Sequence, residues 1–137
     1  MPLLILASDP TPGDDTLLYT GIALDGLDGD DVVQLRFGQD LDSDDYANLS
    51  NIEIIDLMPV GQDHALSNLT LADVIDMTDG RNTLEIRGDS GDSVELVGTW
   101  TSAGNGGFTT YTQTLDDSSA TVRIQNDIDV TVSTIDQ

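Results

Sequence analysis

Hydrophobic and polar residues alternate in short runs along most of this chain. Val94 and Leu96 alternate with Ser93 and Glu95, and the run that follows residue 120 repeats the pattern. A period of two is typical of β-strands with one buried face, and Asp, Gly and Asn residues mark turns between the runs. Strands are therefore predicted at residues 3–7, 16–20, 32–37, 52–58, 83–87, 93–97, 109–114, 120–125 and 129–133.

One stretch follows a helical period instead. Leu71 and Val74 lie at helical spacing, and Thr70 with Asp73 forms a capping-box pair at its start. The pattern predicts one short helix near residues 71–77. The polar stretches at 39–50 and 101–108 are expected to be loops.

Two Asp-Gly stretches, PGDDTLLY at 12–19 and DGDDVVQL at 28–35, resemble each other. Two copies alone do not make a solenoid, which normally needs three or more. The residues up to about 58 are nevertheless expected to run as parallel, solenoid-like turns of the β-roll or β-helix kind. From residue 83 the connections are short, which favours antiparallel hairpins. The 137 residues are therefore expected to form a single all-β domain (1–137) with one short helix, and a β-sandwich is the alternative.

The charge balance restricts the possible functions. Lys and Arg total 4 against 26 Asp and Glu, so the formal net charge is -22, and 23 of the acidic residues are aspartates. Aspartate favours turns and the oxygen cages that bind hard cations such as Ca²⁺, although the acidic surface of a halophile would have a similar charge. This charge repels nucleic acid and anionic membrane surfaces. The absence of cysteine excludes thiol catalysis, zinc–thiolate sites and disulfides.

One Asp-Gly stretch fits a calcium pattern. Residues 26–34, GLDGDDVVQ, match the nonapeptide G-G-x-G-x-D-x-U-x except at the second glycine, which is Leu27. Ca²⁺ takes six to eight oxygens, so a neighbouring turn has to complete the site. A pair of Asp-Gly turns without metal is the alternative interpretation. The candidate calcium ligands and turn residues are Gly26, Asp28, Gly29 and Asp31, with Gly13 and Asp15 from the neighbouring turn.

Other site-like features favour structural roles. The acidic run at residues 40–45 lacks the glycine and terminal glutamate of an EF-hand. A single Asp-Ser-Gly at 89–91 lacks the second copy that an aspartic protease needs. His64 is expected in a surface loop. No set of residues indicates catalysis, so the protein is not expected to be an enzyme.

The large aromatic residues allow two interpretations. Trp100 and Tyr111 flank the glycine-rich stretch at 101–108 and could form a platform that binds a sugar or another ligand. They could equally close one end of a core that contains few aromatic side chains.

The longer patterns LSNIEIIDL (49–57), LTLADVIDMTDGRNTLEIRGDSGDSVELVGTW (69–100) and YTQTLDDSSATVRIQNDIDVTV (111–132) resemble a module of giant bacterial RTX adhesins. Gly26, Gly29, Asp31 and Val33 match the calcium nonapeptide of hemolysin-type repeat proteins. The resemblance implies a non-enzymatic calcium-binding structural or adhesion module that folds outside the cell on binding Ca²⁺. The alternative function is that of a tip domain of the same class of adhesin, which binds a glycan or a protein.

The same resemblance implies type I secretion, a place at the bacterial cell surface and a role in cell adhesion and biofilm. The chain would be a fragment of a larger secreted protein and a monomer within it, without insertion into the membrane. The export signal of such proteins is C-terminal, and residues 127–137 are the stretch where it would lie.

Overall fold

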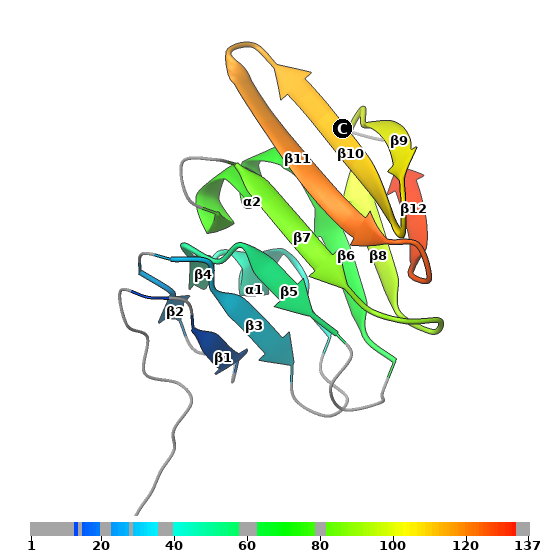
Figure 1. Ribbon diagram of the computed structural model, residues 1–137. Helices are drawn as coiled ribbons and strands as arrows, with labels where there is room; N and C mark the ends of the chain where they lie inside the picture. Colours follow the sequence, from blue (N-terminus) through cyan, green and yellow to red (C-terminus); the bar gives the residue numbers. More distant parts are fainter. Residues whose placement is uncertain are drawn as a thin grey trace, which may run out of the picture.

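The computed structural model describes residues 13, 15–19, 23–27, 29–35, 40–57, 63–78 and 82–133 (Figure 1). Within them the protein is all-β with two short helices, and the predicted strand at 3–7 lies outside the described residues. The strands are β1 Thr16–Tyr19, β2 Leu24–Asp25, β3 Val32–Leu35, β4 Leu49–Ser50, β5 Ile54–Asp56, β6 Ala65–Leu69, β7 Thr83–Arg87, β8 Ser93–Val97, β9 Thr101–Asn105, β10 Phe108–Leu115, β11 Ser118–Gln125 and β12 Asp129–Ser133; the helices are α1 Ser43–Tyr46 and α2 Leu71–Met77.

The largest sheet has seven strands in the order β1-β3-β5-β7-β11-β10-β9. The five strands from β1 to β11 pair in parallel, and β10 and β9 then add in antiparallel orientation. The register places Thr16 beside Val32 and Val32 beside Ile54, so the residues that precede these strands also lie next to one another.

Two smaller sheets complete the fold. A three-stranded parallel sheet has the order β12-β8-β6, and β2 pairs with β4 in a two-stranded parallel sheet. The chain alternates between the two larger sheets: β5 is followed by β6, β7 by β8, and β11 by β12. The strands β3, β5 and β7 are each added beside an earlier strand of the seven-stranded sheet, whereas β9, which follows β8, pairs with the later strand β10.

The core lies between the sheets and α2. Alternate residues of the strands point inward, as the period of two predicts, and aliphatic side chains dominate. The core includes Leu17, Tyr19, Val33, Leu35, Ile55, Leu66, Leu69, Val74, Met77, Leu84, Ile86, Val94, Leu96, Val122 and Ile124.

The predicted helix is confirmed within its predicted bounds. Thr70 is the N-cap of α2, its Oγ1 accepts the backbone N–H of Asp73, and the Asp73 side chain accepts the N–H of Thr70 in return. This capping box satisfies two of the amides that a helix start leaves unpaired. Leu71, Val74 and Met77 are buried, so the apolar spacing fixes which face of α2 meets the core.

Two expectations about the second half of the chain are corrected. β7 and β8 are not a hairpin, because they belong to different sheets and each has parallel partners. Antiparallel pairing is confined to β9, β10 and β11 among the described strands. A short connection is compatible with a corner between two sheets as well as with a hairpin. The β-sandwich alternative, built of antiparallel sheets, does not describe these mainly parallel sheets.

Both predicted loops contain regular structure. Asp42 caps the four-residue helix α1, and β4 follows within the same stretch. The stretch at 101–108 holds β9, which pairs with β10 around a turn at Gly106 and Gly107. Tertiary pairing overrides weak local propensity at these positions.

The corner between β7 and β8 depends on Gly91. Its backbone has a φ of +104°, a conformation that side chains with a Cβ rarely adopt, and a Cβ there would collide with the Asp63 carboxylate. Asp92, which follows, is buried. The corner therefore needs a residue without a side chain.

We expect Gly91→Ala to lower the free energy of unfolding by about 1–3 kcal/mol, because the backbone is strained and Asp63 has to move. Gly104→Ala is the matched control, since nothing lies within 4 Å of a Cβ at Gly104. Urea unfolding of both variants measures the difference. Equal stability of the two variants would contradict this account of the corner.

Candidate functional site

The structure brings the two predicted Asp-Gly turns together. Because β1 pairs with β3, Asp15 lies beside Asp31: the N–H of Val32 donates to the Asp15 carbonyl, and the N–H of Asp15 donates to Oδ1 of Asp31, each at 2.8 Å. Gly13 precedes this pair in an exposed bend. Asp28 lies outside the described residues.

Glu53 extends the pair into a carboxylate column, the name used here for Asp15, Asp31 and Glu53. The N–H of Asp31 donates to Oε1 of Glu53 at 2.7 Å, and the N–H of Glu53 donates to the Asp31 carbonyl. Asp31 is fully buried and Glu53 nearly so. Each member immediately precedes a strand of the seven-stranded sheet. The carboxylates of Asp31 and Glu53 accept an N–H of the preceding turn, and the carbonyls of Asp15 and Asp31 accept an N–H of the next turn.

Glu53 was not predicted as a site residue, although a sequence pattern that identifies it was present. An acidic residue followed by two strand residues occurs in Asp31-Val32-Val33 and in Glu53-Ile54-Ile55. In both, the second strand residue is buried. The acidic residue that precedes a strand, and not the glycines, is therefore the pattern that identifies the third member of the column.

Left-handed backbone occurs where the nonapeptide pattern has glycine. Leu27 occupies the place of the second glycine and has a φ of +65°, and Gly29 has a φ of +97°. The Asp25 side chain holds this turn by accepting hydrogen bonds from the N–H of Leu27 at 2.9 Å and from Nδ2 of Asn51 at 2.8 Å. The turn therefore keeps a glycine-like shape despite the leucine.

Gly26 allows a close approach of two oxygens. A Cβ at Gly26 would collide with the carbonyl oxygen of Asn51 and would lie 2.6 Å from Oδ2 of Asp31. A backbone oxygen and a carboxylate oxygen thus converge on the space that a side chain would fill. Carbonyl and carboxylate oxygens are the ligands that Ca²⁺ prefers.

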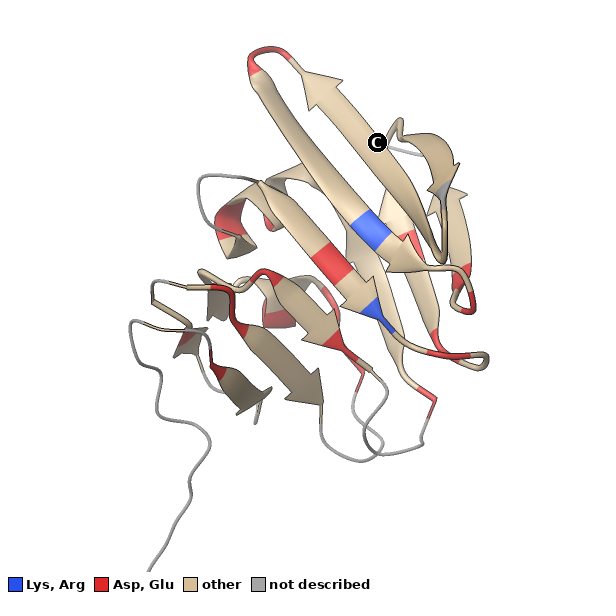
Figure 2. Cartoon of the chain, viewed as in Figure 1, with Lys and Arg blue, Asp and Glu red and all other residues tan. Residues whose placement is uncertain are grey.

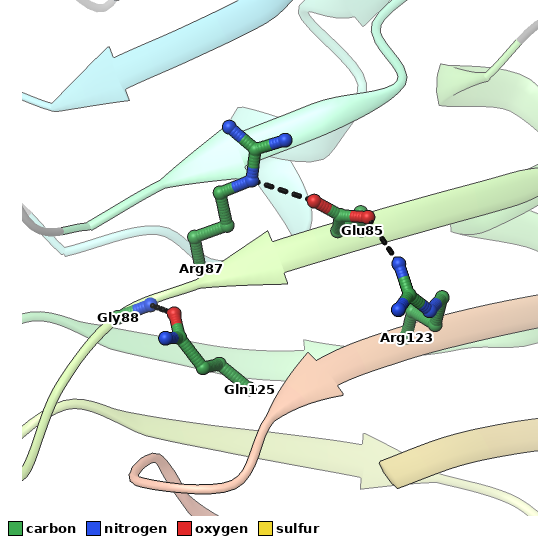
Figure 3. A network of polar contacts seen from close by, with 5 residues as sticks. All are labelled: Glu85, Arg87, Gly88, Arg123 and Gln125. Carbon is green, nitrogen blue, oxygen red and sulfur yellow. Dashed lines mark hydrogen bonds and ion pairs between the residues drawn. The ribbon is translucent and has the colours of Figure 1, made fainter. Parts of the chain in front are cut away.

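A cleft of about 150 Å³ adjoins the carboxylate column. Its lining includes Glu53 of the column and two further acids, Asp30 and Glu85. Nε of Arg87 and Nη1 of Arg123 each lie 2.6 Å from a different oxygen of Glu85 (Figure 3). Both arginines are more than one-third exposed, so these ion pairs add little stability.

Many acidic residues lie at strand ends and turns, others lie within β7, β8 and α2, and β9, β10 and β11 contain no acid (Figure 2). Among the residues that the structure describes, no group of three or more His, Cys, Asp or Glu side chains is placed to hold a metal ion. A calcium site at the Asp-Gly turns would therefore need backbone carbonyls as well as carboxylates.

A second corner uses a buried carboxylate in the same way. Oδ1 of Asp92 accepts the N–H of His64 at 2.8 Å, and Oδ2 accepts the N–H of Asp89 at 2.8 Å. Burial raises the pKa of Asp92, and these two hydrogen bonds partly oppose the shift. The expectation of a surface His64 was wrong: it is 2% exposed, because it precedes β6 at this corner.

The acidic run at residues 40–45 has structural roles. Asp42 and Asp45 form the capping box of α1, and Oδ1 of Asp40 accepts the N–H of Ala65 at 2.9 Å. The hydroxyl of Tyr19 donates to Oδ1 of Asp45 at 2.8 Å. Backbone and hydroxyl donors thus account for these carboxylates.

Trp100 and Tyr111 pack against the core and are partly buried. The indole N–H of Trp100 donates to the Val97 carbonyl at 3.0 Å. This packing agrees with the second of the two interpretations given above, in which the rings close one end of the core.

Comparisons with protein-family models, curated proteins and solved structures find no match. Neither α1 nor α2, the helices in the described part of the chain, is long and apolar enough to cross a membrane.

Replacing Leu27 by glycine tests the shape of the turn. We expect Leu27→Gly to stabilise the protein by about 0.5–1 kcal/mol, because relief of left-handed strain outweighs the greater freedom of glycine in the unfolded chain. Leu27 is 41% exposed, so little burial is lost. Leu18→Gly, at an exposed strand position, is the control and should destabilise. Urea unfolding measures both, and destabilisation by Leu27→Gly would contradict the assignment.

The buried Asp92 predicts a pH dependence. Its folded-state pKa is raised, so its contribution to stability is present at low pH and is lost as the pH rises through that pKa. We expect the stability of the wild type to fall more steeply than that of Asp92→Asn as the pH rises above about 4, the ordinary pKa of an aspartate. Urea unfolding at stepped pH measures the two slopes.

Asp25 predicts a pH dependence of stability with the opposite sign and serves as the control. The hydrogen bonds from Asn51 and then from Leu27 lower its pKa, so its contribution is lost as the pH falls through the folded-state pKa. Parallel slopes for the wild type and Asp92→Asn would refute the role given to Asp92.

Proposed function

We propose that this chain is a non-enzymatic calcium-binding structural module of a secreted bacterial adhesin of the RTX type. The observation that carries the proposal is the turn at residues 25–31. Leu27 and Gly29 have left-handed backbone where the nonapeptide has glycine, and Asp31 is buried beside Asp15 of the neighbouring turn. The long sequence resemblance to these adhesins agrees with it.

We further propose that the sheets form a short solenoid. The alternation of the chain between the two larger sheets supports this arrangement, as does the parallel register. The offsets between paired residues are unequal: Thr16 pairs with Val32, Val32 with Ile54 and Ile54 with Glu85. Turns of unequal length account for the weak repeat in the sequence.

The residues that would hold calcium are Asp15 and Asp31, with the carbonyl of Asn51 beside Gly26. A bound Ca²⁺ supplies positive charge that offsets repulsion among the carboxylates. This chain contributes oxygens fixed by the parallel pairing of β1 with β3. Because no group of three or more described His, Cys, Asp or Glu side chains is placed to hold a metal ion, modest affinity is expected, as in extracellular modules with dissociation constants of about 10⁻⁴–10⁻³ M.

The proposed role in the cell follows from this affinity. A chain with a net charge of -22 would stay open at low calcium during type I export and would close outside the cell, where calcium is abundant. At the cell surface the module would serve adhesion and biofilm as part of a longer protein. The alternative of a glycan- or protein-binding tip through Trp100 and Tyr111 has less support, because both rings pack against the core.

Calcium titration of EDTA-treated protein at constant ionic strength tests the proposal. At a hundredfold excess over the dissociation constant, one ion should add about 2.7 kcal/mol to the stability, which thermal melting followed by circular dichroism detects. Asp31→Asn should lose most of this gain. Asp117→Asn removes the same charge from an exposed turn and should keep it.

Magnesium at equal concentration controls for screening of charge. Equal stabilisation by Mg²⁺ and Ca²⁺, or equal gains in Asp31→Asn and the wild type, would refute the calcium site.

A further inference from the structure

An open groove shares no lining residue with the carboxylate column. It is bounded by α2, by the end of β8 and by the β10–β11 hairpin, which projects past the neighbouring strands (Figure 1). Its volume of about 570 Å³ falls within the range typical of small-molecule sites. Neither the calcium proposal nor the packing of the aromatic residues explains it.

The walls of the groove are largely apolar. Leu71, Ala72 and Ile75 of α2 line one side, and Val97 and Leu115 line the other. Leu115 is 58% exposed, more than any other large hydrophobic residue that the structure describes. An apolar ligand would remove this surface from water.

Gln113 adds one polar group to the groove. It pairs with the buried Ala120 across the hairpin, and its Oε1 is buried without a hydrogen-bond donor among the described residues. Gly98, with a φ of +121°, makes room for it, because a Cβ there would lie 2.8 Å from that oxygen. A buried acceptor without a donor lowers stability, and a ligand O–H or N–H would recover that loss.

Charge restricts the ligand further. Among the described residues that line the groove, Asp116 is acidic and none is Lys or Arg, and the whole chain carries a net charge of -22. An anionic ligand would therefore be repelled. The remaining Thr70, Thr99 and Ser118 side chains are neutral.

We propose that this groove binds a small uncharged ligand with an aliphatic body and one hydrogen-bond donor, and that the donor pairs with Gln113. The site is separate from the calcium turns, so it stands or falls independently of the proposed function. It also replaces Trp100 and Tyr111 as the place where this fold would hold a ligand.

A matched pair of probes tests the proposal by ¹⁵N-resolved NMR of the whole chain. 1-Hexanol has an aliphatic body and one O–H, and methyl pentyl ether has the same number of atoms without the donor. Hexanol should shift the amide signals of Ile75, Gly98 and Thr99 and the side-chain amide of Gln113. The ether should bind about tenfold more weakly, as expected for an acceptor left unpaired, and hexanoate should bind more weakly still.

Variants of the groove distinguish the contribution of the ligand's hydrogen bond to Gln113 from that of the apolar walls. Gln113→Met should bind hexanol and the ether equally, whereas Thr114→Val, at an exposed position of the same strand, should keep the wild-type preference. Ala72→Trp, which fills the groove from an exposed helix position, should abolish binding of hexanol.

Three results would overturn the proposal: shifts that are absent or scattered over the surface, equal binding of hexanol and the ether by the wild type, or undiminished binding by Ala72→Trp. If Gln113→Met fails to fold, the wild-type comparison of the two probes and Ala72→Trp still decide the outcome.

Discussion

The fold depends on carboxylates that accept backbone N–H groups at the corners where strands begin. An N–H just before a strand has no ladder partner of its own, and leaving it buried and unpaired would cost free energy. Asp31 accepts the N–H of Asp15, Glu53 accepts that of Asp31, and Asp92 accepts those of His64 and Asp89. Each of these hydrogen bonds uses an acidic side chain, so each additional corner adds negative charge to the fold.

This constraint connects the composition with the proposed function. A carboxylate that satisfies backbone donors in one turn repels its neighbour in the next, and little positive charge is present to balance it. A divalent cation at the Asp-Gly turns offsets the repulsion without removing the acceptors. By contrast, β9, β10 and β11 satisfy their backbone by antiparallel pairing and need no acids. The largely apolar groove is bounded in part by the hairpin of β10 and β11.

The sequence predicted local features best where one physical signal dominates. The capping box of Thr70 and Asp73, with the spacing of Leu71 and Val74, fixes α2, and the alternation around Val94 and Val122 fixes β8 and β11. Sheet membership was not predictable from the short connection at Gly91, because a corner and a hairpin need the same turn residues. β9 was missed, since its Thr-Ser-Ala-Gly-Asn sequence has low strand propensity and forms a strand by pairing with β10.

The candidate site was predicted in part. The likeness of the two Asp-Gly stretches correctly placed Asp15 beside Asp31, because parallel pairing preserves a repeat. Glu53 and Asp92 lack neighbouring glycines of the nonapeptide kind, so the motif could not find them. Anomalous X-ray scattering from crystals grown in millimolar calcium tests the central claim most directly. The account predicts an ion about 2.3–2.6 Å from an Asp31 carboxylate oxygen. No scattering peak beside Asp31, with its Oδ1 still bound to the N–H of Asp15, would contradict it.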